Sequence, residues 1–279
     1  MKDPAADLEL ALDAARQAGA LVMRWFRTHL EVRHKSPGQP VTDADLAADA
    51  LLHQILTTAR PEYGWLSEET ADQPARLERE RVWLVDPIDG TRSFVAGHPE
   101  FSVSVGLAEA GLPILGVVLN PATGEVYWAV RGVGVWGSTT GGGEATLSVR
   151  AAERDVVVLA SRNEIRRGEL DAVAQATEGG RTWQLEGIGS TAYKLARVAA
   201  GAADAFLSLG PKSEWDVCAG ALLLEMAGGS ATAIDGEAFR YNKPRPAVRG
   251  VLATTPPLRQ ALLSIAARIR AGPSDNEAE

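Results

Sequence analysis

The residues most able to do chemistry lie in segment 83–91, WLVDPIDGT, where an apolar run leads directly to two aspartates three positions apart. The apolar run has the pattern of a buried strand. We expect Pro87 to end this strand and turn the chain, so that Asp86 and Asp89 converge. Two carboxylates that close repel each other unless they are protonated or bridged by a cation. Their oxygens are hard ligands that suit Mg²⁺ or Mn²⁺.

Gly90 and Thr91, the last two residues of the same segment, are of types that could bind a phosphate. Glycine lets a backbone approach a ligand closely, and Thr91 would offer a hydroxyl and an amide at the start of a helix. The same residues also fit a DG turn capped by aspartates, so the motif alone does not decide between the two interpretations.

Three other acidic segments border predicted elements. They are Glu68 and Glu69 in LSEE after a short apolar strand, Asp43 and Asp45 in VTDAD before a helix, and Glu214 and Asp216 in EWD at the opening of another helix. Each has an ordinary explanation, because surface glutamates are usually solvated and aspartates favour helix N-caps. Only their combination with segment 83–91 favours a shared metal site.

The composition limits the classes of protein to which the chain can belong. The 279 residues are 46% hydrophobic and 23% charged, which is typical of a globular chain that forms one large domain or two packed halves. The formal net charge of -8 argues against a nucleic-acid or anionic-membrane partner. Bound cations would still give a negatively charged small substrate a locally positive site.

The sequence does not support an internal disulfide, a dinucleotide-binding site or a membrane-spanning segment. The single cysteine, Cys218, excludes an internal disulfide and lies in an apolar run, so we expect a buried packing residue. The GxGxxG match at 132–137 lies among predicted strands, so we interpret it as turns rather than a dinucleotide site. The N-terminal sequence has no apolar signal core, and no run of about eighteen apolar residues occurs, so we expect a cytoplasmic protein.

The elements that position the acidic residues fall into two expected halves. Residues 1–145 predict two amphipathic helices, the strand that carries Asp86, and antiparallel strands over 101–136. The first helix is expected to bury Leu8, Leu12, Ala15, Val22 and Phe26. A glycine-rich loop, 139–146, leads to an α/β half, 146–271, that contains Asp216 and the substrate-pocket residues. This half predicts a strand at 156–160, helices near 169–176 and 191–200, a strand at 205–209, and helices from Trp215 and over 258–271. We expect residues 272–279 to be disordered.

In order and at comparable separations, these motifs resemble the inositol-monophosphatase-like superfamily of lithium-sensitive, magnesium-dependent phosphatases. The residues that carry the resemblance are D-P-hydrophobic-D-G-T after a tryptophan-led strand at 83–91 and the W-D-x-x-A helix start at 215–219. The resemblance extends from about Val41 to Asn242. It implies an α/β (α+β) fold built as a layered α-β-α-β-α sandwich, with two or three Mg²⁺ ions per site, Mn²⁺ as an alternative, and inhibition by Li⁺.

The resemblance also implies roles for individual residues. The metal ligands would be Glu68, Asp86, the backbone carbonyl of Ile88, Asp89 and Asp216, with Asp86 shared by two ions and Asp45 near a third. Glu68, Thr91 and Asp45 are the implied catalytic residues, with Glu68 and Thr91 deprotonating the attacking water. The amides of Gly90 and Thr91 would hold the phosphate.

Finer similarity to CysQ-type 3′(2′),5′-bisphosphate nucleotidases comes from PVTDADLAAD, LSEE and LGPKSEWD. It implies removal of the 3′-phosphate from 3′-phosphoadenosine 5′-phosphate. Ser208 stands where inositol phosphatases carry an acid that binds inositol hydroxyls. We expect Ser190 to line the nucleotide pocket and Lys194 and Arg162 to bind substrate phosphates, although Lys194 also fits a helix surface and Arg162 a loop salt bridge. The loop at 241–242 is expected to contact the base.

Two other functions stay open at this point. One is inositol monophosphatase or broad sugar phosphatase activity on the same small, phosphorylated class of metabolite. The other is a catalytically silent binding or scaffold protein, against which stands the presence of Glu68, Asp86, Asp89, Thr91 and Asp216 together. Relatives are often dimers, which makes a homodimer an expectation without a residue-level argument.

Overall fold

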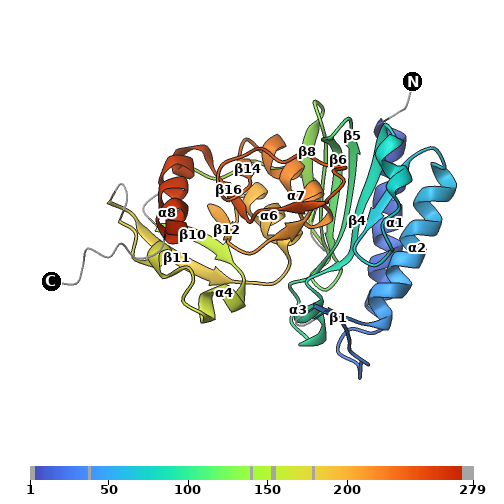
Figure 1. Ribbon diagram of the computed structural model, residues 1–279, viewed down its shortest axis with the longest axis horizontal. Coiled ribbons are helices and arrows are strands. Elements are labelled where there is room, and N and C mark those ends of the chain that lie inside the picture. The colour runs from blue at the N-terminus through green and yellow to red at the C-terminus, as the bar shows by residue number, and fades with distance from the viewer. Residues whose placement is uncertain (1–3, 37–38, 139–140, 152–154, 178–179, 272–279) are drawn as a thin grey trace.

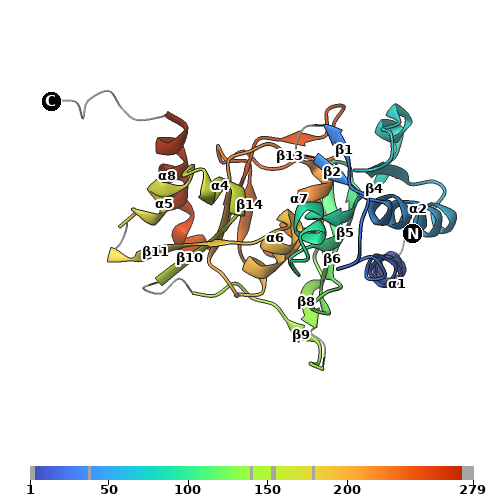
Figure 2. The same cartoon turned by 90° about the horizontal axis from the view of Figure 1, so that it is seen from below.

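Helices and sheets alternate in five layers (Figure 1). The computed structural model describes residues 4–36, 39–138, 141–151, 155–177 and 180–271. Helices α1 (Pro4–Val22) and α2 (Asp43–Ala59) cover one face of a seven-stranded sheet. Helices α6 (Thr191–Ala199) and α7 (Glu214–Met226) fill the space between this sheet and a five-stranded sheet, as the view from below also shows (Figure 2). The outer face of the second sheet carries α8 (Arg259–Ala271). The layered sandwich expected from the sequence is thus confirmed.

The seven-stranded sheet has the order β3-β4-β5-β6-β7-β8-β9 and is antiparallel except for the parallel pair β3 and β4. Its strands are β3 (Gly64–Ser67), β4 (Arg81–Asp89), β5 (Ser102–Glu109), β6 (Leu112–Asn120), β7 (Glu125–Val130), β8 (Gly134–Ser138) and β9 (Ala145–Thr146). The predicted strands over 101–136 are confirmed, and the GxGxxG match forms a turn and the start of β8. The last two residues of the predicted glycine-rich loop instead form β9, because they pair with β8.

The five-stranded sheet has the order β11-β10-β12-β16-β14. Its strands are β10 (Asp155–Ala160), β11 (Thr182–Gly187), β12 (Ala205–Ser208), β14 (Ser230–Thr232) and β16 (Val251–Thr254). The sequence patterns missed β11, β14 and β16; β14 and β16 have three and four residues, and β11 and β14 carry polar residues. Short elements complete the fold: hairpin strands β1 (Arg33–Ser36) and β2 (Gln39–Val41), the pair β13 (Lys212–Ser213) and β15 (Ala247–Val248), helices α3 (Thr91–Val95), α4 (Arg162–Arg166) and α5 (Asp171–Ala174), and 3-10 turns η1 (Pro74–Glu78) and η3 (Pro256–Leu258).

The first helix packs through alanine rather than through leucine. Its fully buried stripe consists of Ala11, Ala14, Ala15, Ala18 and Val22, whereas the leucines expected in the core are only partly buried. Small side chains allow α1 to lie close to α2, which presents its own alanines. The helix ends at Val22, so the ring of Phe26 lies beyond it and packs 5.0 Å from that of Phe101, centroid to centroid. The tail 272–279 lies outside the described residues.

Helix α7 lies very close to the seven-stranded sheet at two glycines. A Cβ at Gly116 would lie 2.7 Å from the carbonyl oxygen and 2.8 Å from the Cα of Ala219. A Cβ at Gly106 would lie 2.7 Å from the Sγ of Cys218, which is fully buried as expected. Because these atoms are mostly backbone of α7, the helix keeps its position only with glycine in the sheet. Among the described residues, no helix combines the length and apolar character needed to cross a membrane.

Gly116→Ala should therefore lower the free energy of unfolding by about 1–3 kcal/mol, since α7 must shift to admit a methyl group. Urea unfolding measures the loss. Gly143→Ala is the matched control, because a Cβ there meets nothing within 4 Å, and its effect should stay within about 0.5 kcal/mol. Equal stability of the two variants would contradict a tight contact between α7 and β6.

Candidate active site

A one-residue bulge in β4 brings Asp86 and Asp89 to the same side of the sheet. Asp86 pairs with Ser104 and Asp89 pairs with Ser102, so three steps along β4 match two along β5. Residues three apart in a regular strand point to opposite faces, and one extra residue corrects this. The expectation that Pro87 ends the strand is wrong: β4 continues through Asp89. Proline is tolerated there because a bulge leaves one residue outside the hydrogen-bond ladder.

Glu68 follows β3 at the edge where Asp86 lies. The parallel register pairs Ser67 with Val85, and the amide of Glu68 donates to the Val85 carbonyl at 3.2 Å. The ladder ends with this pair, and the residues that follow each partner are Glu68 and Asp86, whose carboxylates lie close together. Asp49 of α2 accepts hydrogen bonds from the hydroxyls of Ser67 and Thr70, one on each side of Glu68. Helix α2 therefore fixes the turn that presents Glu68.

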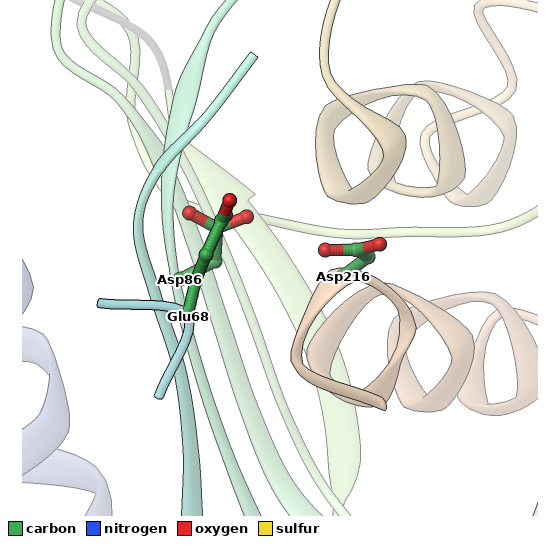
Figure 3. Close-up of side chains that lie close together, drawn as sticks. All are labelled: Glu68, Asp86 and Asp216. Atoms are coloured by element: carbon green, nitrogen blue, oxygen red, sulfur yellow. The ribbon is translucent and has the colours of Figure 1, made fainter. Parts of the chain in front are cut away.

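Asp216 approaches the two strand carboxylates from the other side, at the start of α7 (Figure 3). Each of Glu68, Asp86 and Asp216 offers a carboxylate oxygen, and these oxygens lie within 4.8 Å of one another. The N-cap of α7 is Ser213, and its amide donates to Asp216 Oδ2 at 2.8 Å in a capping box. The interpretation of Asp216 as the N-cap is therefore wrong, because the N-cap is Ser213, three residues earlier. The Asp216 side chain still caps the helix from its first turn.

Asp45 occupies the equivalent position at the start of α2, with Thr42 as the N-cap. Asp45 Oδ2 accepts from the amide and the hydroxyl of Thr42, at 2.8 and 2.6 Å. Its other oxygen lies 3.1 Å from the hydroxyl of Thr91, which also lies 3.1 Å from the Ile88 carbonyl oxygen. Thr91 opens α3 after Gly90, whose φ of 99° favours glycine. The cap thus holds Asp45 against Thr91.

Asp89 is held by the start of α6. Its Oδ2 accepts from the Ser190 hydroxyl at 2.6 Å and from the Ala192 amide at 2.5 Å. Ser190 is also the N-cap of α6. Lys194 is buried, and its ammonium donates to the carbonyls of Ile188 and Gly189 at 3.3 and 3.2 Å. Both residues line the cleft described below, yet the protein already occupies much of their hydrogen-bonding capacity.

The carboxylates destabilise one another's charged forms. Burial raises the pKa of Asp86 well above its usual range, and the charges of Glu68, Asp89 and Asp216 add to this. Desolvation, with Asp89 and Glu68, raises the pKa of Asp216 to about 8. Lys35 of β1 is a cation close to this group, 2.7 Å from Glu68 and 2.9 Å from Glu69. A divalent cation fits this set of oxygen donors, because it would stabilise the ionised carboxylates together.

The carboxylates form one end of a cleft of about 450 Å³. Its lining includes Gly90, Thr91, Ser190 and Lys194 of the expected substrate site, and the side chains of Arg162 and Lys212. Arg162 pairs with Glu100 at 2.8 Å, as the salt-bridge alternative allowed. The lining therefore combines the carboxylates, which form an acidic end, with five cationic side chains, those of Arg92, Arg162, Arg167, Lys194 and Lys212. The lining residues within 161–167 and 208–212 are called the cationic wall. Tyr241 is buried, and neither it nor Asn242 is among the lining residues.

Sequence reasoning missed two residues of this wall, Glu164 and Lys212. The carboxylate of Glu164 accepts a hydrogen bond from Ser208, the position at which an acid was judged to be missing. The wall therefore keeps an acid, although a different element, α4, supplies it. Both residues lie just beyond the ends of strands β10 and β12, where the cleft opens, and this placement was the available signal.

Comparisons with known proteins agree with this arrangement. A family model described as "Inositol monophosphatase family" matches residues 3–270. An inositol-1-monophosphatase of Mesorhizobium japonicum is 36% identical over 82% of this chain and 86% of its own length. The 3′(2′),5′-bisphosphate nucleotidase CysQ of Salmonella typhimurium is 35% identical over 84% of this chain and 93% of its own length. The crystal structure of extragenic suppressor protein suhB from Bartonella henselae superposes with a TM-score of 0.78 and 28% identity, covering 94% of this chain and 99% of that one.

In metal-free protein, thermal stability should fall as the pH rises from 6 to 8. The aspartates with raised pKa bind protons more tightly in the folded state than in the unfolded state, whose value is near 3.8. Their stabilising contribution is present below that value and is lost as the pH approaches about 8. Mg²⁺ at about 100 times its Kd should add about 2.7 kcal/mol. It should raise Tm more at pH 8 than at pH 6.

Differential scanning fluorimetry in EDTA and in Mg²⁺ measures both effects. Asp216→Asn is the matched variant, since it keeps the shape and removes a titrating group; it should flatten the pH dependence in EDTA. A Tm that is insensitive to Mg²⁺ at both pH values would count against a metal site here.

Proposed function

Because the chain belongs to the inositol monophosphatase family of phosphatases, we propose that it is a magnesium-dependent enzyme that removes the 3′-phosphate from 3′-phosphoadenosine 5′-phosphate. The products would be AMP and phosphate. The observation that carries this proposal is that one cleft is lined both by carboxylates and by cationic side chains. Glu68, Asp86 and Asp216 are the carboxylates that lie together, and Arg162 and Lys212 are among the cations. A substrate with two phosphates suits both sets, with one phosphate at the proposed metal ligands and the other at the cationic side chains.

The acidic end would hold the metal ions, with Glu68, Asp86, Asp89, Asp216 and the Ile88 carbonyl as the proposed ligands. Bound Mg²⁺ would lower the pKa of the attacking water and stabilise the leaving oxygen. The bulge in β4 and the starts of α6 and α7 fix the carboxylates before substrate arrives, so little reorganisation is needed.

Thr91 and Asp45 would accept the proton of the attacking water. When the Thr91 hydroxyl donates to Asp45 Oδ1, the lone pairs of Thr91 are free to accept from water. Burial raises the pKa of Asp45, although hydrogen bonds from Thr42 oppose this. A carboxylate with a raised pKa is a better proton acceptor. We propose that Glu68 orients the same water and that the amides of Gly90 and Thr91 hold the phosphate.

The cationic wall would bind the second phosphate through Lys212 and Arg162 rather than through Lys194. Within the described part of the chain, the hydrogen-bond contacts of the Lys212 ammonium are to two carbonyls, those of Gly210 and Pro211, at 3.5 and 3.4 Å. Such long contacts are easily exchanged for a phosphate oxygen. Lys194 is buried and lies 5.0 Å from the Phe206 ring centroid, and its charge favours the ionised form of Asp89. Lys194 therefore stabilises the ionised carboxylate of Asp89 at the acidic end.

A second candidate, inositol monophosphatase activity, is favoured by Glu164. An acidic side chain in the cleft wall suits a polyol, whose hydroxyl groups are hydrogen-bond donors. The relatives named inositol-1-monophosphatase and CysQ are also similar to this chain to nearly the same degree.

Phosphate release from 3′-phosphoadenosine 5′-phosphate and from inositol 1-phosphate, measured side by side with Mg²⁺, should favour the nucleotide. Lys212→Met should lower kcat/KM for the bisphosphate roughly tenfold, which corresponds to one lost charge-assisted hydrogen bond. The same variant should leave inositol 1-phosphate hydrolysis within about twofold. Preference for inositol 1-phosphate by the wild-type enzyme would make the second candidate the better one.

Asp89→Asn should leave the fold intact and reduce turnover to below a few per cent of wild type at saturating Mg²⁺, because one charge is lost from the acidic end. Asp155→Asn, at an exposed position at the start of β10, is the control and should keep wild-type activity. Substantial turnover by the Asp89 variant would show that this carboxylate is not a metal ligand.

A further inference from the structure

The first turn of α7 presents two acidic side chains in different directions. Glu214 is the first residue of the helix and Asp216 is the third, and residues two apart on a helix do not face the same side. Asp216 lines the cleft, whereas Glu214 is fully buried and is not among the lining residues. Glu214 therefore contacts neither the proposed metal ions nor the substrate, and any effect it has on the reaction must pass through the helix.

The Glu214 carboxylate binds the backbone of segment 242–246. Its Oε2 accepts from the amide of Asn242 at 2.6 Å, and its Oε1 accepts from the amide of Lys243 at 3.2 Å. The Lys243 ammonium lies 3.7 Å from Oε1. The Glu214 amide in turn donates to the carbonyl of Pro246 at 3.0 Å. Segment 242–246 thus holds the first residue of α7 both by its side chain and by its backbone.

Arg76 of η1 binds the same segment from the opposite side. Its side chain is buried, and it donates to Asn242 Oδ1 at 2.7 Å and to the Lys243 carbonyl at 3.0 Å. The Asn242 side-chain amide donates back to the Arg76 carbonyl at 3.2 Å. Asp72 orients the guanidinium through contacts of 2.6 and 2.8 Å. Because hydrogen bonds from a charged donor are short and strong, these contacts fix segment 242–246 against η1.

Arg76 lies in the connection between the two strands that lead to the other acidic residues of the site. This connection follows β3, after which Glu68 lies, and precedes β4, which carries Asp86. The capping box of α7 orients Asp216 only within its own helix. The contacts that run from Glu214 through segment 242–246 to Arg76 instead fix the first turn of α7 relative to β3 and β4.

We propose that Glu214 is a positioning residue that sets the affinity of the site for a divalent cation. It holds the start of α7, through segment 242–246 and Arg76, where Asp216 can share the cation with the two carboxylates of the sheet. Without this tie the first turn of α7 would retreat, since repulsion among the carboxylates favours a wider spacing. The cation would then bind only the fraction of molecules in which Asp216 is in place, which weakens its apparent affinity. This inference rests on the metal-dependent function proposed above.

Calorimetric titration of Mg²⁺ into protein that has been treated with EDTA and dialysed tests the inference. Glu214→Gln keeps the shape of the side chain but replaces one acceptor oxygen with an NH₂ donor, so one backbone amide of segment 242–246 loses its partner. The Kd for Mg²⁺ should rise about tenfold, which corresponds to the loss of one hydrogen bond to a charged group. Turnover at saturating Mg²⁺ should fall by less than about threefold, because excess cation restores the position of Asp216.

Asn242→Gly tests the same tie from its other end. Asn242 has a φ of 59°, a left-handed conformation that glycine adopts without strain. This variant therefore removes the side-chain bonds to Arg76 and keeps the backbone that Glu214 binds. Its Kd for Mg²⁺ should rise about three- to tenfold. The result also decides the question if Glu214→Gln does not fold.

Glu225→Gln is the matched control, because Glu225 lies on the same helix and loses a comparable contact, its pair with Arg131, far from Asp216. Its Kd for Mg²⁺ should stay within about twofold of wild type. An unchanged Kd in both Glu214→Gln and Asn242→Gly, even with a lower Tm in EDTA, would assign the tie a purely structural role and overturn the inference. Equal weakening in Glu225→Gln would also overturn it, since lower helix stability would then explain the effect.

The wild-type titration separates this inference from the proposed function. Wild-type protein that binds no Mg²⁺ would contradict the metal-dependent function itself, and the positioning role with it. Mg²⁺ binding by the wild type that neither variant weakens would contradict the positioning role alone.

Discussion

The repulsion between closely spaced carboxylates is the constraint on which the rest of this structure depends. Glu68, Asp86 and Asp216 bring oxygens within 4.8 Å of one another in a setting that raises the pKa of both aspartates. Side chains under such repulsion would move apart unless the backbone held them. The bulge of β4, the parallel β3–β4 register and the capping boxes of α2 and α7 supply that restraint. The bulge and the register are backbone features, and the capping boxes tie the side chains of Asp45 and Asp216 to backbone amides, so these side chains are not free to move apart.

The N-termini of α2, α6 and α7 hold aspartate side chains at this site and add partial positive charge beside them. The first-turn aspartates of α2 and α7 satisfy amides of their own helices, and their remaining oxygens face the cleft residues. Asp89 receives an amide at the start of α6. The partial positive charge of these helix ends offsets some of the repulsion among the carboxylates. This arrangement requires α6 and α7 to lie against the first sheet, which is the reason that Gly106 and Gly116 carry no side chain where α7 crosses.

The acidic end and the cationic wall of the cleft are suited to different chemical groups. The acidic end is assembled from strands β3 and β4 of the seven-stranded sheet and from the starts of α2, α6 and α7, and it is suited to a cation and a phosphoryl group. The cationic wall is local, built from the segments after β10 and β12. Because it consists of short connections, its residues can vary more readily than the strands and helices that carry the carboxylates. Glu164 and Lys212 belong to this wall, and the choice among phosphorylated substrates is therefore expected to depend on it.

The sequence by itself determined the family resemblance, the layered fold and the strands and helices that have long apolar patterns, because hydrophobic periodicity and the motif at 83–91 are local signals. It could not show β11, β14 and β16, whose short segments become strands only through their neighbours. It also could not show that Pro87 lies within a strand, since the bulge exists only in the pairing with β5. The family resemblance implied that Asp216 and Asp86, 130 residues apart, share a site, and the tertiary structure shows how they meet; it alone put Glu164 against Ser208. Those contacts join residues far apart in sequence, and no local pattern encodes which distant side chain will fill a given position in space.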